Sequence, residues 1–143
     1  MTGADIVAEA RSYMGVRWKH QGRDRSGIDC AGLVIKVGQA FDVLDFDTAD
    51  YGPQASDESM LRLCREHLIE VGRDAMAPGD ILVMRFGGNR HMGIVGDYLY
   101  GGPSVIHAFT ARRKVTEHRF DDAWLKAMGA SFLACFRFPG VTA

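Results

Sequence analysis

The sequence predicts an α+β domain in which helices come first and an antiparallel sheet follows. In the first half of the chain, apolar residues recur at the three- and four-residue spacing of a helix. From about residue 78 onward they form short runs of strand length, separated by Gly-containing turns. A length of 143 residues with 47% hydrophobic residues suits one core, so we predict a single domain over residues 1–143.

Three helices are predicted before residue 78. Thr2 and Asp5 resemble a capping box at the start of the first helix. Side-chain caps and terminal glycines mark the other boundaries. The predicted first and last residues are Thr2 and Gly15, Cys30 and about Phe41, and Ser56 and Gly72. The apolar stripes are Ile6, Val7, Ala10, Tyr13 and Met14; Leu33, Val34, Val37 and Phe41; and Met60, Leu61, Cys64, Leu68 and Ile69.

The predicted strands cover residues 81–84, 91–95, 104–110, 114–118 and 132–138, with a short helix over 121–128. Gly87–Arg90 looks like the connection of a hairpin. Because side chains alternate across a strand, the last strand is expected to place four of them on one face. These are Phe132, Ala134, Phe136 and Phe138.

The composition excludes few functions but narrows the setting. A formal net charge of -1 gives no general reason to expect a nucleic acid or an anionic membrane as partner. Three cysteines make a poor disulfide framework and are typical of a reducing compartment. The first residues show no basic segment followed by an apolar core, and no run approaches the roughly 18 apolar residues of a membrane span. We therefore expect synthesis in the cytoplasm without a signal peptide.

Cys30 is the candidate nucleophile. It would lie in the first turn of the second helix, where backbone N–H groups are unpaired and the helix dipole favours negative charge. A thiol in that position is expected to have a pKa below its free value of about 8.5. Cys64 and Cys135 fall on an apolar stripe and in a strand, so core packing is expected for both.

Two histidines are candidates to work with this thiol. His91 begins one predicted strand and His107 lies in the middle of the next. Adjacent antiparallel strands can bring two such side chains within hydrogen-bonding reach on one face. Histidine titrates near neutrality and can take and return a proton. His67 and His118 are expected on the surface.

The loop over residues 15–28 is basic and leads into Cys30. It carries five Lys, Arg or His residues against Asp24 alone: Arg17, Lys19, His20, Arg23 and Arg25. One interpretation is a solvated loop. The other is that Arg23 and Arg25 hold carboxylates of a substrate. Asp29 is expected to cap the Cys30 helix or to hold the loop backbone.

Five segments of the sequence resemble the NlpC family of papain-like cysteine peptidases and occur in the order of that family. They are Gly15–Trp18, Gly27–Val34, Pro78–Ile81, His91–Val95 and Ile106–Ala108. The resemblance implies an α+β papain-like core and hydrolysis of D-Glu to diamino-acid bonds in peptidoglycan stem peptides, without a cofactor. It implies that Cys30 is the nucleophile, His91 the general base and His107 the residue that orients His91.

The small size, the absent signal peptide and the basic stretch from Trp18 to Arg23 look most like the phage-tail-associated members of this family. That likeness implies phage tail proteins as partners and a destination in the virion tail or at the cell wall.

The sequence departs from the family at two positions near the nucleophile. Trp18 stands where Tyr is usual, and Ala31 stands where Ser is usual. An indole N–H donates a hydrogen bond but cannot accept one. We expect the Cys30 backbone N–H, helped by the Trp18 indole, to hold the oxyanion of an acyl transfer.

Three other functions are compatible with the sequence. A zinc site could use Cys30, His91 and His107, although the paired ligand spacing typical of such sites is missing, so no metal is predicted. A non-catalytic tail or wall-binding module could have kept the fold without the activity. An acyltransferase could pass the acyl group from Cys30 to an amine instead of water.

Overall fold

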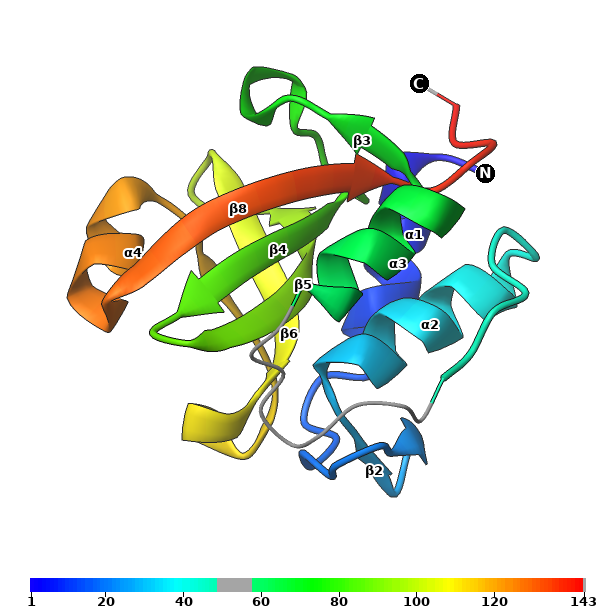
Figure 1. The fold of residues 1–143 in the computed structure, drawn as a ribbon, viewed down its shortest axis with the longest axis horizontal. Coiled ribbons are helices and arrows are strands. Elements are labelled where there is room, and N and C mark those ends of the chain that lie inside the picture. Colours follow the sequence, from blue (N-terminus) through cyan, green and yellow to red (C-terminus); the bar gives the residue numbers. More distant parts are fainter. Residues whose placement is uncertain (49–57, 143) are drawn as a thin grey trace.

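The computed structural model describes residues 1–48 and 58–142 and has the predicted α+β architecture. Three helices, α1 (Gly3–Arg11), α2 (Cys30–Ala40) and α3 (Ser59–His67), lie together on one side of a sheet, and α4 (Asp122–Met128) lies at the opposite end of the molecule (Figure 1). The predicted capping box is confirmed, because Thr2 and Asp5 exchange side-chain to backbone hydrogen bonds of 2.8 and 3.2 Å.

The main sheet has six strands in the order β3-β8-β4-β5-β6-β7, and every neighbouring pair is antiparallel. The predicted antiparallel sheet after residue 78 is therefore confirmed. The strands are β3 (Ile69–Val71), β4 (Ile81–Phe86), β5 (Asn89–Asp97), β6 (Pro103–Phe109), β7 (Lys114–Arg119) and β8 (Ala130–Arg137). Gly87 and Gly88 join β4 to β5, and Gly87 has the positive φ that glycine tolerates best.

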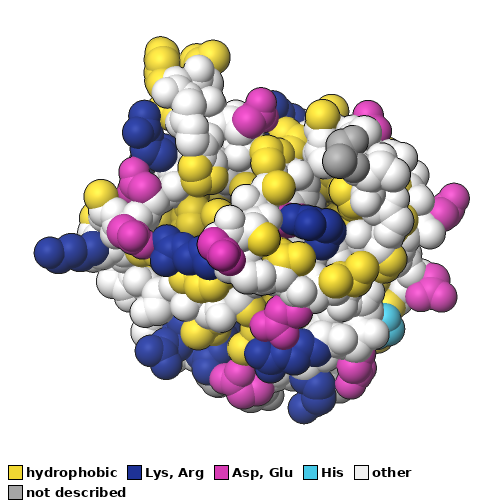
Figure 2. All heavy atoms as spheres, turned by 90° about the horizontal axis from the view of Figure 1, so that it is seen from above, with side chains coloured by type: hydrophobic (Ala, Val, Ile, Leu, Met, Phe, Trp, Pro, Cys, Tyr) yellow, Lys and Arg dark blue, Asp and Glu magenta, His cyan; other side chains and the backbone are white. Residues whose placement is uncertain are grey.

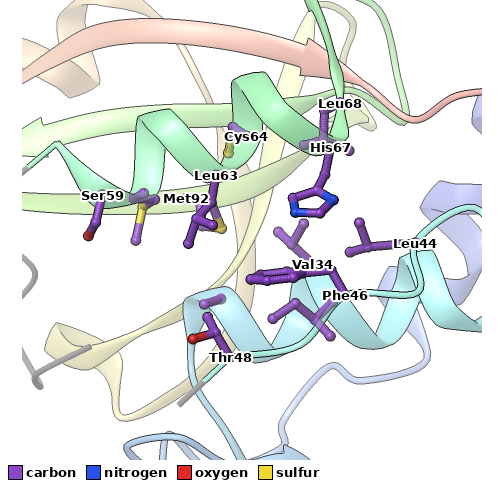
Figure 3. Close-up of a pocket in the computed structure, with 13 residues that line it drawn as sticks. Val34, Leu44, Phe46, Thr48, Ser59, Leu63, Cys64, His67, Leu68 and Met92 are labelled. Atoms are coloured by element: carbon purple, nitrogen blue, oxygen red, sulfur yellow. The ribbon is translucent and has the colours of Figure 1, made fainter. Parts of the chain in front are cut away.

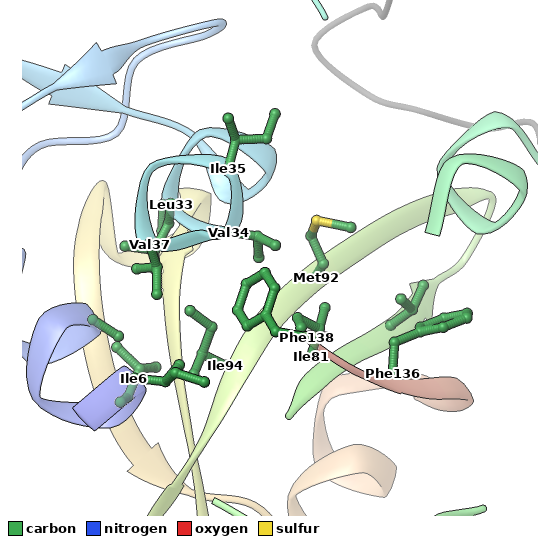
Figure 4. Packing of buried hydrophobic residues seen from close by; sticks show 14 of the residues in the cluster. Ile6, Leu33, Val34, Ile35, Val37, Ile81, Met92, Ile94, Phe136 and Phe138 are labelled. Carbon is green, nitrogen blue, oxygen red and sulfur yellow. The ribbon is translucent and has the colours of Figure 1, made fainter. Parts of the chain in front are cut away.

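Buried residues form one cluster on each face of this sheet. The larger cluster packs α1, α2 and α3 against the sheet, with Ile6, Leu33 and Ile94 among its fully buried members (Figure 4). The smaller one lies between the other face and α4 and includes Leu82, Val105 and Leu125. Because alternate side chains of β4 enter opposite clusters, the whole run over residues 81–84 is buried.

The expectation that the last strand places four side chains on one face is wrong for Phe132. The register of β8 against β4 shifts by one residue between Val83 and Met84, which pair with Ala134 and Phe132. Leu133 is the extra residue of this bulge. Phe132 therefore packs in the smaller cluster, whereas Ala134 and Phe136 are in the larger one.

Two other boundaries differ from the prediction. Helix α1 ends at Arg11 rather than near Gly15, and the loop over 15–28 contains a short hairpin of β1 (Arg23–Asp24) and β2 (Gly27–Ile28). Helix α3 ends at His67 rather than at Gly72, because residues 69–71 pair with β8 as strand β3. The predicted cap at Ser56 lies outside the described residues.

The surface carries no large patch of one charge on the face seen from above in Figure 2, where basic and acidic side chains alternate. Within residues 1–48 and 58–142, no helix combines the length and apolar character needed to cross a membrane.

Candidate active site

Cys30 is the first residue of α2, as predicted, and Asp29 is its N-cap. The buried Asp29 carboxylate accepts hydrogen bonds from the backbone N–H groups of Gly32 at 2.8 Å and Gln21 at 2.7 Å. It also pairs with the Arg23 guanidinium at 3.2 Å. A Cβ at Gly32 would lie 2.3 Å from the carbonyl oxygen of Gly22, so only glycine lets this loop approach the helix so closely. Asp29 thus fixes both the helix start and the loop that precedes it.

The Cys30 sulfur lies beside strand β5. The backbone N–H groups of Met92, Ala31 and Cys30 itself lie near this sulfur and act to lower its pKa. The residue pairs of β5 and β6 end at Ile94 and Ile106, so Met92 lies two residues beyond the last pair. Its N–H is on the β6 side of the strand, because N–H directions alternate and that of Val95 points to Asp80 beside β4.

The expected lowering of the Cys30 pKa is wrong. Burial raises the pKa of the Cys30 thiol to about 11, and the nearby Asp29 carboxylate raises it further. The three backbone N–H groups act in the opposite direction but do not outweigh the loss of water around the sulfur. The resting thiol is therefore protonated at neutral pH, and a base has to take its proton during attack.

The structure brings His91 and His107 together, as predicted. The distance from His91 Nε2 to His107 Nδ1 is 2.6 Å, and the two rings meet edge to face. Burial lowers the pKa of His91 to about 4 and lowers that of His107 well below its usual value. Both imidazoles are therefore neutral at pH 7, in the state in which one ring nitrogen can accept a proton.

His118 is not the isolated surface residue that the sequence suggested. It is half-buried, and its Nε2 lies 2.9 Å from His107 Nε2. Strand β7 pairs with β6 so that Val105 faces His118, and Val105 and His107 point to the same face two residues apart. The signal that could have found His118 is this register, which no local pattern in the sequence reveals.

Aromatic rings enclose the three histidines. His107 stacks on Phe109 with ring centroids 4.5 Å apart, and His118 lies 4.6 Å from Trp124. Phe86 contacts His91 edge to face. On the β5 side, a Cβ at Gly93 would lie 3.0 Å from that of His107, so glycine makes room for the ring. These walls exclude water, which is the largest cause of the low pKa values of His91 and His107; repulsion between neighbouring histidines lowers the pKa values further.

The basic loop is largely engaged in contacts within the protein. Arg23 contacts Asp29 and Asp47 and donates to the carbonyl of Thr48 at 2.7 Å. Arg25 donates to the carbonyl oxygen of Ser12 at 2.6 Å and lies over the Tyr13 ring. The structure thus gives both arginines a structural role, and their binding of substrate stays a prediction.

Trp18 lies close in space to the residues that precede the nucleophile. It forms an isolated parallel bridge with Ile28, two residues before Cys30, and packs partly against the larger core. Its backbone N–H donates to the carbonyl of Arg113 at 2.8 Å. The predicted role of its indole N–H at an oxyanion stays a prediction.

An apolar hollow lies between α2 and α3 next to the thiol (Figure 3). It begins at Ala31 and Met92, whose backbone N–H groups contact the Cys30 sulfur. Farther along, His67 stacks on Phe46 with ring centroids 4.3 Å apart. The rest of its described lining is Val34, Ile35, Leu44, Thr48, Ser59, Met60, Leu63, Cys64 and Leu68.

The zinc alternative gains no geometric support. Among the described residues, no three His, Cys, Asp or Glu side chains are arranged to hold a metal ion. The imidazole nitrogens of His91, His107 and His118 are hydrogen-bonded to one another instead of converging on one point.

Comparison with known proteins places this geometry in a family. The model of the NlpC/P60 family matches residues 15–131, which include Cys30, all three linked histidines and the strands β5, β6 and β7 that carry them. The chain belongs to the NlpC/P60 family. The predicted resemblance is thereby confirmed, whereas its phage-tail branch stays a prediction.

Among curated proteins, this NlpC/P60 chain is similar to the murein DD-endopeptidase MepS/murein LD-carboxypeptidase of Escherichia coli strain K12, with 26% identity over 122 residues. The match covers 85% of this chain but 57% of that protein, so the chain spans little more than half the length of its relative.

Among solved structures, the NlpC/p60 domain of the peptidoglycan hydrolase SagA has a TM-score of 0.64 and 21% identity, covering 96% of this chain and 100% of that one. NlpC2 from Trichomonas vaginalis has a TM-score of 0.70 and 17% identity, covering 96% and 46%. RipB from Mycobacterium tuberculosis has a TM-score of 0.60 and 21% identity, covering 94% and 63%. These likenesses show the shared fold.

Proposed function

We propose that this chain is a cysteine peptidase that hydrolyses amide bonds in the stem peptides of bacterial peptidoglycan. The observation that carries the proposal is the Cys30 thiol at a helix start, close to the backbone N–H of Met92, the neighbour of His91, whose ring is hydrogen-bonded to that of His107. This is the nucleophile, base and orienting residue of a thiol acyl transfer. Membership of the NlpC/P60 family and the murein endopeptidase name of the E. coli relative support the substrate class.

The first half of the reaction forms an acyl-enzyme. Because the resting thiol is protonated, His91 takes the Cys30 proton as the sulfur attacks the amide carbonyl. The oxyanion forms beside backbone N–H groups at the start of α2, where the helix dipole favours negative charge. His91 then gives its proton to the departing amine, the C–N bond breaks, and a thioester remains on Cys30.

The second half returns the enzyme to its resting state. His91 takes a proton from water, and the resulting hydroxide attacks the thioester carbonyl. The C–S bond breaks, His91 returns the proton to the Cys30 sulfur, and the product leaves as a carboxylic acid that loses its proton to the solvent. His107 holds the His91 ring throughout, so that one ring nitrogen remains available as the base.

For the bond that is cut, we propose the amide between D-Glu and the diamino acid of the stem peptide. Members of the resembled family cut this bond, whereas the name of the E. coli relative refers to DD and LD bonds. The bonds differ in the masses of their fragments, so product analysis distinguishes them. Association with a phage tail and delivery to the cell wall are part of the proposal that can be tested by locating the chain in particles.

The test compares the wild type with Cys30→Ala on purified stem peptides and intact sacculi, with products read by mass spectrometry. New fragments from the wild type alone are expected, at a rate that Cys30→Ala reduces to background. Fragments joined to an added amine would indicate an acyltransferase.

The alternative of a binding module predicts a different pattern. In that case neither protein yields fragments, both bind sacculi equally well, and Cys30 is no more reactive toward iodoacetamide than the buried Cys64 and Cys135. This result would overturn the proposal that the chain is a peptidase.

A further inference from the structure

A continuous line of hydrogen bonds runs from His91 to a backbone carbonyl at the edge of the sheet. His91 Nε2 lies 2.6 Å from His107 Nδ1, and His107 Nε2 lies 2.9 Å from His118 Nε2. The last member, His118 Nδ1, lies 2.9 Å from the carbonyl oxygen of Arg119. Three rings on three adjacent strands, β5, β6 and β7, are thus joined end to end.

The carbonyl at the end of this line sets the direction of every bond in it. A carbonyl oxygen only accepts, so His118 Nδ1 carries the proton. When His118 is a neutral imidazole, its Nε2 then accepts, so His107 donates from Nε2 and accepts at Nδ1. His91 consequently donates from Nε2. Its Nδ1 is left with a lone pair, the atom that can take the proton of the thiol.

We propose that His118 is a positioning residue that fixes the tautomer of His107 and, through it, the tautomer of the base His91. This inference rests on the proposed peptidase function and assigns the site a fourth member. His118 touches no reacting atom. It selects which nitrogen of His91 is basic.

Removal of His118 leaves this selection open. His107 Nε2 would face the rings of Phe109 and Trp124, which offer no acceptor as good as an imidazole nitrogen. His107 could then place its proton on Nδ1 instead, which would require His91 to accept at Nε2 and carry its proton on Nδ1. A His91 ring in that form presents an N–H where the thiol needs a base. Burial keeps the resting His91 and His107 rings neutral, so neither carries a proton on both nitrogens. Each ring therefore has its single proton on either Nδ1 or Nε2.

The first test is nitrogen-15 NMR of the histidine side chains in the free protein, which distinguishes protonated from unprotonated ring nitrogens. The expected pattern is Nε2–H for His91 and His107 and Nδ1–H for His118. A His118 protonated only at Nε2, or a His91 protonated only at Nδ1, would overturn the proposal. Because this measurement needs no substrate, its outcome is independent of whether the chain cleaves peptidoglycan.

The second test uses His118→Phe, which keeps a ring against Trp124 but removes both nitrogens, and His118→Gln, whose amide can accept from His107 and donate to the Arg119 carbonyl. With a stem peptide, His118→Phe is expected to lower kcat about tenfold with KM unchanged, because only the fraction of molecules with the correct tautomer reacts. His118→Gln is expected to recover most of this loss.

Thr116→Val is the matched control. Thr116 lies on the same face of β7 two residues away, and its hydroxyl has no hydrogen-bond partner within the described residues. This variant should keep the wild-type kcat. A purely structural role of His118 predicts instead that His118→Phe and His118→Gln lose kcat equally, or that the loss follows the melting temperature across the variants. Either result, or an unchanged kcat in His118→Phe, would overturn the proposal.

If no variant cleaves any peptide, the alkylation rate of Cys30 by iodoacetamide replaces kcat. The same order is expected, with the wild type and Thr116→Val fastest, His118→Gln next and His118→Phe slowest. Loss of peptide cleavage with this order preserved counts against the proposed function but in favour of the tautomer chain.

Discussion

Two different structures hold the candidate active site, one on each side of the Cys30 sulfur. On the helix side, the buried Asp29 carboxylate gathers two backbone N–H groups and the Arg23 guanidinium. On the strand side, His91, His107 and His118 are joined by hydrogen bonds that end on a backbone carbonyl. The first support is built around a full negative charge, whereas the buried rings of the second are kept neutral.

The difference follows from what each support has to do. The helix side must hold a loop and a helix start in place, and a carboxylate that accepts several hydrogen bonds does this strongly. The strand side must take and return one proton. A permanent charge next to His91 would bias that exchange in one direction, and the neutral ring of His107 avoids this. We therefore expect the helix side to dominate stability and the strand side to dominate kcat.

The largest effect on stability is expected for Asp29→Ala. The substitution removes the N-cap of α2 and leaves the Gln21 and Gly32 N–H groups and Arg23 without their shared acceptor. The expected loss in the free energy of unfolding is about 3 kcal/mol, since the helix loses its cap and two backbone N–H groups lose their acceptor. Urea unfolding followed by circular dichroism measures it.

Asp24→Ala is the control for that measurement, because Asp24 is an exposed carboxylate of the same loop whose side chain accepts hydrogen bonds from its near neighbour Ser26. Its unfolding midpoint should stay near the wild-type value. Equal losses for Asp24→Ala and Asp29→Ala would contradict a charge-based support on the helix side.

A pH-dependent effect on stability is expected from acid on the strand side. The pKa of His91 in the folded protein is about 4, below its ordinary value of 6.5, and that of His107 is lowered as well. Below pH 6.5 these histidines therefore bind protons in the unfolded chain but not in the folded one. The contribution of these histidines to the free energy of unfolding is fully present above pH 6.5. It is lost as the pH falls toward 4, by about 1.4 kcal/mol per pH unit for each such histidine.

His91→Phe isolates this contribution. Its absolute stability differs from the wild type, but only the slope of unfolding free energy between pH 6.5 and pH 4.5 is compared. The variant should lose stability less steeply, by the equivalent of about one proton. Parallel slopes in the two proteins would mean that His91 is not held neutral by burial.

The parts of this molecule that sequence could predict are those with local signals. The capping box at Thr2 and Asp5, the acidic residue before Cys30 and the spacing of the apolar stripe place α1 and α2 correctly at their starts. The strands after residue 78 follow from short apolar runs between turns. The pair of His91 and His107 also follows, because consecutive strands of a meander are usually neighbours.

The features that the sequence did not predict depend on contacts between distant segments. Residues 69–71 leave the helical pattern because they pair with β8, some 65 residues away in the chain. The Cys30 pKa is raised because β5 and the loop bury the thiol, although its local position at a helix start favours the opposite shift. His118 joins the site only through the register of β7 against β6. Burial and register are properties of the assembled sheet, and no short window of sequence contains them.

The smallest predicted effect concerns the basic loop and separates its two arginines. Arg23 belongs to the helix-side support, because it contacts the carboxylates of Asp29 and Asp47. The contacts of Arg25 within the described residues are with neutral groups of Ser12 and Tyr13, so its positive charge remains uncompensated near the surface. If the loop attracts carboxylates of the stem peptide, Arg25→Gln should raise KM about threefold at low salt and leave kcat unchanged, since exposed charges contribute less than about 1 kcal/mol.

Salt and a remote charge provide the controls for this prediction. Added NaCl at about 0.5 M should remove most of the difference in KM, because it screens exposed charges beyond a few ångströms. Lys126→Gln on α4 changes the net charge by the same amount away from the loop and should keep the wild-type KM. Arg23→Gln should instead lower the free energy of unfolding. An equal rise in KM for Lys126→Gln and Arg25→Gln would show that only net charge matters. The loop would then serve solely to hold Asp29 and the start of α2.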